Sequence, residues 1–193
     1  QNNVVSVVLS YDRLACRERK PFLLPASFAA ISTLVIFDGA CSGMAGFDPS
    51  FNFSAWSALE ILSLDLNLLS EFPCVPALRS LFMLDLANNF LSSLPDCFGE
   101  FVGMSELIFS GNQITQLPPS IANLTWLSAL SGAENRISAL PEFVCRLTNL
   151  RVIDLERNAL TWLPPCLLSL PQLYYLVLSH NFISQLPVPS GSQ

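Results

Sequence analysis

The sequence predicts an α/β solenoid of about eight stacked coils, with a parallel β-sheet on the concave side and short helical or irregular turns on the convex side. The first observation behind this prediction is a frame of three apolar residues and an asparagine that recurs every 22 or 23 residues. The second is an apolar–proline pair that begins five residues after each asparagine. A single coil of this kind cannot bury its own apolar side, whereas stacked coils bury a continuous core.

Six regular frames read apolar, two residues, apolar, one residue, apolar, two residues, asparagine. Alternation with period two indicates a short strand whose apolar side chains point inward. The asparagine side chain can bond to buried backbone groups of its own coil and of the neighbouring coil, so a ladder along the stack is expected. The ladder residues are Asn67, Asn89, Asn112, Asn135, Asn158 and Asn181.

Two degenerate frames precede the regular ones, and the whole chain is predicted to be a single domain. In these two frames Val4, Val7 and Leu9 lead to Asp12, and Ile31, Leu34 and Ile36 lead to Gly39. The predicted parts of the domain 1–193 are two longer degenerate repeats (1–58), six regular repeats of 22–23 residues (59–187) and a tail (188–193).

The segment after each apolar–proline pair returns the chain to the next strand. Proline can open this return, because the loss of its N–H costs little there. Apolar residues recur every three positions in these segments, for example at Ile121, Leu124 and Leu127, which indicates a short helical turn.

One inward position departs from the pattern. Gly132 stands where leucine is expected, and the same position of the preceding coil holds the oversized Phe109. Close packing disfavours both voids and overfilling, so the Phe109 ring is predicted to fill the space beside Gly132. The alternative is a simple cavity.

The composition excludes several classes of protein. Hydrophobic residues make up 51% of the 193 residues and charged residues only 12%, which is the opposite of a disordered chain. The long uncharged stretches are interrupted by prolines and amides, so none is predicted to be a membrane helix. A net charge of −6 disfavours nucleic acid. The basic cluster of Arg13, Arg17, Arg19 and Lys20 is expected to be a solvated loop rather than an anionic docking site.

The frame and its Leu-Pro pairs resemble the leucine-rich repeat family, in the 23-residue form of Ras-group and related intracellular proteins. The resemblance covers essentially the whole chain and implies a curved right-handed horseshoe. It implies a non-catalytic protein–protein interaction module in intracellular signalling or scaffolding, located in the cytoplasm. The implied partner is another protein, such as a small GTPase or another signalling protein.

Catalysis, cofactors and metals are not expected. The one histidine, His180, has no nucleophile beside it in the pattern and is expected to be a solvated surface residue. The cysteines form no C-x-x-C pair, so a zinc site is not expected. They are predicted to be free buried thiols, although a disulfide between Cys74 and Cys97, at similar places in adjacent coils, is geometrically conceivable. The six are Cys16, Cys41, Cys74, Cys97, Cys145 and Cys166.

The outward strand positions carry apolar residues with scattered acids, which is typical of a protein-binding surface. The predicted contacts on this concave face are Phe37, Ile61, Asp65, Met83, Asp85, Ile108, Asp154, Glu156, Arg157, Tyr175 and His180. Asp85 and Asp154 have a structural alternative, because aspartate is common at this position of the repeat form. For Phe37 and Tyr175 the alternative is to cover the edge of a neighbouring coil.

Other functions stay open on the sequence alone. One is an extracellular receptor or adhesion fragment that binds a ligand, which a disulfide or a glycan at Asn123 would favour. The sequons at Asn52 and Asn123 are about as many as chance yields, so they carry little weight. Another is the substrate-recognition region of a larger enzyme, such as a ubiquitin ligase or a kinase. Neither end of the stack has an obvious polar cap, which leaves three alternatives open: missing flanking sequence, fraying of the terminal coils, or self-association through the uncapped ends.

Overall fold

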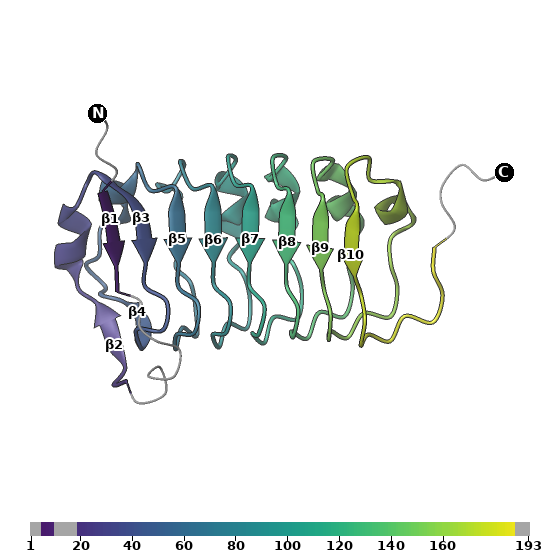
Figure 1. Ribbon diagram of the computed structural model, residues 1–193, viewed down its shortest axis with the longest axis horizontal. Helices are drawn as coiled ribbons and strands as arrows, with labels where there is room; N and C mark the ends of the chain where they lie inside the picture. The colour runs from purple at the N-terminus through teal and green to yellow at the C-terminus, as the bar shows by residue number, and fades with distance from the viewer. Residues whose placement is uncertain (1–4, 10–18, 188–193) are drawn as a thin grey trace.

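The computed structural model describes residues 5–9 and 19–187, which form a row of stacked coils (Figure 1). Eight short strands lie side by side in one parallel sheet, in the order β1-β3-β5-β6-β7-β8-β9-β10. Their bounds are β1 Val5–Val8, β3 Leu34–Asp38, β5 Ile61–Ser63, β6 Met83–Asp85, β7 Glu106–Ile108, β8 Ala129–Ser131, β9 Val152–Asp154 and β10 Tyr175–Val177. The predicted solenoid with a parallel sheet is confirmed.

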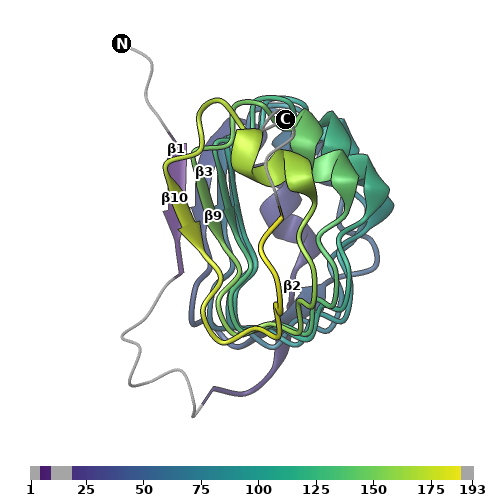
Figure 2. The same ribbon diagram turned by 90° about the vertical axis from the view of Figure 1, so that its right-hand side faces the viewer.

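The turns opposite the sheet are 3-10 helices, as the view along the stack shows (Figure 2). They are η2 Ala26–Ala30, η3 Phe53–Trp56, η4 Asp96–Glu100, η5 Pro119–Asn123, η6 Glu142–Arg146 and η7 Pro165–Ser169. The last four begin directly after the proline of an apolar–proline pair, as the sequence predicted. Near the N-terminus, β2 (Phe22–Leu24) and β4 (Met44–Phe47) form a second, two-stranded parallel sheet.

The core runs as one cluster through all the coils. In a regular coil all three apolar frame residues are fully buried, as Leu59, Leu62 and Leu64 illustrate. Leu173 and Leu176 of the last coil are only partly buried, since no further coil of the described chain covers them.

The asparagine ladder is present as predicted. The Asn112 side-chain Oδ1 accepts the Leu91 N–H of the preceding coil at 2.9 Å, and its Nδ2 donates to the carbonyls of Leu86 and Phe109, each at 2.9 Å. The other five ladder asparagines repeat this arrangement. One side chain therefore satisfies buried backbone groups of two coils.

The residue before each ladder position has a left-handed backbone. The residues concerned are Leu66, Asn88, Gly111, Glu134, Arg157 and His180, and Cys41 has the same conformation with φ of 55°. Cys41 precedes Ser42, so Ser42 and not Gly39 stands at the ladder position of the second coil. The Ser42 hydroxyl donates to the Gly39 carbonyl at 2.8 Å and lies 3.1 Å from Asn67 Oδ1.

The frame predicted for the second coil is therefore wrong by three residues. β3 pairs with β5 so that Phe37 lies beside Leu62 and Ile36 beside Ile61. The inward residues are Leu34, Phe37 and Gly39. In the first coil, Val7 lies beside Phe37 and not beside Leu34, the neighbour that the predicted frames gave it. Val4 and Asp12, the ends of the first predicted frame, lie outside the described residues.

Phenylalanine compensates for glycine in two places. A Cβ built on Gly132 would overlap the Phe109 ring, which is fully buried, so the predicted compensation is confirmed and the alternative of a cavity is not. A Cβ on Gly39 would likewise meet the Phe37 ring, at 2.7 Å. The second coil thus uses the same exchange of volume within a single strand.

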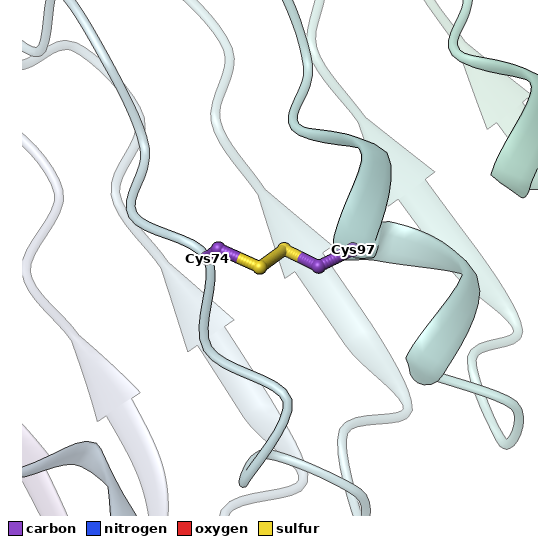
Figure 3. The surroundings of a disulfide bond; sticks show 2 residues. All are labelled: Cys74 and Cys97. Atoms are coloured by element: carbon purple, nitrogen blue, oxygen red, sulfur yellow. A yellow bond between two sulfur atoms is a disulfide. The ribbon is translucent and has the colours of Figure 1, made fainter.

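Disulfides join adjacent coils on the convex side. Cys74 bonds to Cys97 and Cys145 to Cys166, with Cα–Cα distances of 5.7 and 5.9 Å. Figure 3 shows the first, between an extended return segment and helix η4. Cys41 is disulfide-bonded as well. The expectation of free thiols is wrong for these cysteines, because stacking brings equivalent positions of neighbouring coils within bonding range; Cys16 lies outside the described residues.

Candidate functional site

The outward residues of the eight-stranded sheet form the candidate site, which we call the concave face. Because the strands are parallel and in register, equivalent residues of successive coils form straight rows across it. One row begins with Ser6 on β1, runs through Ile36, Ile61 and Met83, and continues through Glu106 to Tyr175.

Four of the five predicted apolar or aromatic contacts, all but Phe37, lie on the outward side of the sheet. Ile61, Met83 and Ile108 point away from the core and are half-buried among neighbouring side chains. Tyr175, on the terminal strand, is 54% exposed. These side chains offer apolar surface to solvent without contributing to the core.

Phe37 does not belong to the concave face. It is fully buried, and its ring lies 5.0 Å from the Trp56 ring and 6.4 Å from the Phe28 ring, measured between centroids. The predicted frame had Phe37 outward, but that frame was displaced by three residues. A displacement by an odd number of residues exchanges the two faces of a strand. Ile36 takes the outward position instead.

The aspartates of the concave face are held by the backbone of their own strands. The carboxylates of Asp85 and Asp154 accept the N–H two residues further on, from Ala87 at 2.9 Å and Glu156 at 3.0 Å. Asp65 is only 9% exposed and accepts the Asn88 side-chain amide at 2.8 Å. These bonds give each aspartate a structural role within the repeat.

A charged cluster lies where the last strands end. Arg157 Nη1 lies 2.8 Å from the Glu134 carboxylate, and its Nε lies 3.9 Å from Glu156. His180 Nε2 lies 3.8 Å from the same Glu156 oxygen. Glu156, Arg157 and His180, three of the predicted concave-face contacts, lie close together, and Glu134 joins them because it occupies the same loop position as Arg157 one coil earlier.

The sequence analysis missed an exposed ridge along the strand-entry edge. Its members are Phe82, Val102, Trp126 and Tyr174, of which Trp126 is 68% and Tyr174 76% exposed. All four fall within two residues of a frame start, at positions that are mostly polar in the other coils. An aromatic or apolar residue at such a polar position was the sequence signal that could have predicted the ridge. A hollow of about 220 Å³ beside Trp126 is lined by Ser105, Trp126, Ser128, Asn149 and Arg151.

Metal-ligand clusters, shifted pKa values and long apolar helices are scarce among the described residues. No group of three or more His, Cys, Asp or Glu among them could hold a metal ion. The pKa of Asp48, which follows β4 outside the eight-stranded sheet, departs from its ordinary value. It is lowered because the Ser50 hydroxyl, and then the Ser50 N–H, donate to the carboxylate. Within residues 5–9 and 19–187, no helix is both long and apolar enough to span a bilayer.

Family profiles match the regular coils. One leucine-rich repeat profile matches residues 127–183, and a second matches 80–101 and 104–124. The chain belongs to the leucine-rich repeat family. No curated protein matches the sequence.

Solved leucine-rich repeat structures share the fold. A leucine-rich repeat protein of Leptospira interrogans superposes with a TM-score of 0.81 and 26% identity, over 86% of this chain and 42% of that protein. The ectodomain of the membrane receptor kinase GASSHO1/SCHENGEN3 from Arabidopsis thaliana, solved with Casparian strip integrity factor 2, gives 0.80 and 26%. That match covers 91% of this chain and 21% of the ectodomain. An internalin of Listeria monocytogenes, at 21% identity, TM-score 0.71 and coverage of 83% and 46%, shares the fold alone.

Proposed function

We propose that this chain is a single, non-catalytic leucine-rich repeat domain that binds a partner protein through its concave face, outside the cell. One observation carries the proposal. The concave face presents half-buried Ile61, Met83 and Ile108 among acidic side chains on a rigid sheet. Apolar surface surrounded by charge is the composition of a protein-binding patch.

The family supports recognition rather than catalysis. Leucine-rich repeat domains are generally protein-binding, and the Arabidopsis ectodomain that shares this fold was solved with a protein factor bound. The chain spans 42% and 21% of the Leptospira and Arabidopsis proteins. The proposal therefore includes a role for this chain as the partner-recognition region of a larger receptor or enzyme.

The disulfides support an extracellular location. Cys74–Cys97 and Cys145–Cys166 each join two coils, and such bonds persist in oxidising compartments and are rare in the cytosol. They weigh against the Ras-group, cytoplasmic prediction and against a small GTPase partner. The cytoplasmic alternative requires these thiols to be reduced.

Counting thiols tests the location. Protein secreted from eukaryotic cells would be unfolded without reductant and treated with iodoacetamide. We expect no alkylation at Cys74, Cys97, Cys145 or Cys166 by mass spectrometry. Alkylation of all four would remove the argument for an extracellular role.

Affinity capture with matched variants tests the binding face. The wild-type chain, a concave variant carrying Ile61→Arg and Met83→Arg, and a convex variant carrying Leu168→Arg would be compared, each checked for folding by circular dichroism. Leu168 is exposed on η7. A specific partner should be captured by the wild type and the convex variant and lost from the concave variant. The opposite pattern would place binding on the convex side.

A further inference from the structure

The first half of the concave face combines an apolar row with carboxylates. Ile36, Ile61 and Met83 lie side by side on β3, β5 and β6, and Glu106 continues the same row on β7. At the usual strand spacing of about 4.8 Å, the three apolar residues span roughly 10 Å. We call this surface, with Glu60 and Asp85 at its margins, the acidic–apolar patch.

Two carboxylates of the patch have no internal partner. Glu60 is exposed and Glu106 half-buried. Across residues 5–9 and 19–187, neither forms an ion pair or a side-chain hydrogen bond. The Glu60 backbone carbonyl accepts the N–H of Phe82 at 2.8 Å and of Met83 at 3.0 Å. Glu60 therefore lies beside the exposed Phe82, at the edge of the sheet where the strands begin. Both charges are available to a partner.

The balance of charge differs between the halves of the concave face. The four frames 34–42, 59–67, 81–89 and 104–112 contain Asp38, Glu60, Asp65, Asp85 and Glu106 but no Lys, Arg or His. The three frames that follow carry Glu134, Asp154 and Glu156 together with Arg151, Arg157 and His180. In the second half, Arg157 pairs with Glu134 and Glu156, whereas Glu60 and Glu106 in the first half have no ion-pair partner among residues 5–9 and 19–187.

We propose that the acidic–apolar patch binds an extended segment of a partner protein in which an apolar side chain is flanked by lysine or arginine. The inference rests on the proposed concave-face function and names its partner chemistry. The apolar row supplies a dry centre, and the carboxylates at its margins attract basic side chains and repel acidic ones. Like-charge contact would work against an acidic segment, and no base of these four frames offsets it.

Selection from a random peptide library displayed on phage tests this chemistry on the full chain. Enriched peptides should carry Lys or Arg next to Leu, Ile or Phe. Their affinity, measured by fluorescence anisotropy, should fall about tenfold or more with the size-matched double variant Glu60→Gln and Glu106→Gln. The matched control, Glu100→Gln with Glu142→Gln on the convex helices η4 and η6, should leave it unchanged.

The outcomes separate this inference from the proposed function. Enrichment of acidic or uncharged peptides, or basic peptides that bind the Glu60→Gln, Glu106→Gln variant like the wild type, would overturn the inference. If such peptides still lose binding to Met83→Arg, the concave-face function survives with a different partner chemistry. If the enriched peptides ignore Met83→Arg and are lost with Leu168→Arg instead, both proposals fail.

Discussion

The early and the regular coils of this solenoid bury their interiors in different ways. Around the second coil the core is aromatic: Trp56 is fully buried, 5.0 Å from the Phe37 ring and 4.9 Å from the Phe51 ring. In the coils from residue 59 onward the frame residues are mainly leucines, and asparagine stands at every ladder position. The strands of the early coils and of the regular coils nevertheless belong to one continuous sheet.

The comparison shows that a coil is defined by which positions face inward and which position carries the ladder, and not by the residue type at each. An asparagine amide bonds to backbone groups of two coils. The shorter Ser42 hydroxyl donates to the Gly39 carbonyl of its own coil and lies 3.1 Å from Asn67 Oδ1, to which the N–H groups of Ser42 and Met44 also donate. The two small residues Ser42 and Gly39 leave space that Phe37 and its ring neighbours fill. The early coils therefore depend more on aromatic packing, and the regular coils more on the ladder.

The largest expected effect is on the aromatic core. Trp56→Ala should lower the free energy of unfolding by about 3–5 kcal/mol, because it removes the largest buried side chain and the bond from its Nε1 to the Phe28 carbonyl. Chemical denaturation with the disulfides intact measures this. Trp126→Ala is the matched control and should change stability by about 0.5 kcal/mol or less, since Trp126 is largely exposed. Equal effects would mean that the aromatic core is not what holds the early coils.

The ladder comes next. Asn112→Ala should cost about 3 kcal/mol, because the buried Leu91 N–H loses its acceptor and the carbonyls of Leu86 and Phe109 each lose one of two amide donors, keeping those from Asn89 and Asn135. Ser42→Ala should cost only about 1 kcal/mol, since it removes one hydroxyl. The same denaturation experiment measures both. A larger loss from Ser42→Ala would reverse the comparison between the two kinds of coil.

The two disulfides should contribute equally to the free energy of unfolding, although they join different pairs of coils. They close loops of similar length, with sequence separations of 23 for Cys74–Cys97 and 21 for Cys145–Cys166. Loop-closure entropy predicts a loss of about 3 kcal/mol when either pair is replaced by alanine. Unfolding of the two double variants by urea is the measurement, and a loss confined to one pair would show that the coils it joins are already held by packing.

The smallest effect concerns the glycine–phenylalanine exchange in the regular coils. Gly132→Leu should destabilise by roughly 1–3 kcal/mol, because its side chain would compete with the Phe109 ring. Adding Phe109→Leu should restore part of the loss, giving a favourable coupling in a double-mutant cycle. A melting temperature that rises for Gly132→Leu alone would show that the site holds a void after all.

The regular coils could be predicted from sequence because strand alternation, the ladder asparagine and the proline all point to one frame. The second coil could not, since Ile31, Leu34 and Ile36 match the apolar frame as well as Leu34 and Phe37 do. Only three-dimensional packing, with the Phe37 ring beside Gly39, decides between them. The ridge at Trp126 was missed for a related reason: a repeat pattern describes what coils share, whereas an exposed aromatic residue is where one coil differs.

Hydrogen exchange, followed by mass spectrometry on the full chain with and without a selected basic–apolar peptide, tests the central claim most directly. The claim is that binding occurs on the concave sheet, at the half whose frames contain acids and no Lys, Arg or His. Protection should therefore appear in peptides that cover β3, β5, β6 and β7, and should be weak in β9 and β10. Protection confined to the convex helices η4 to η7 would contradict it.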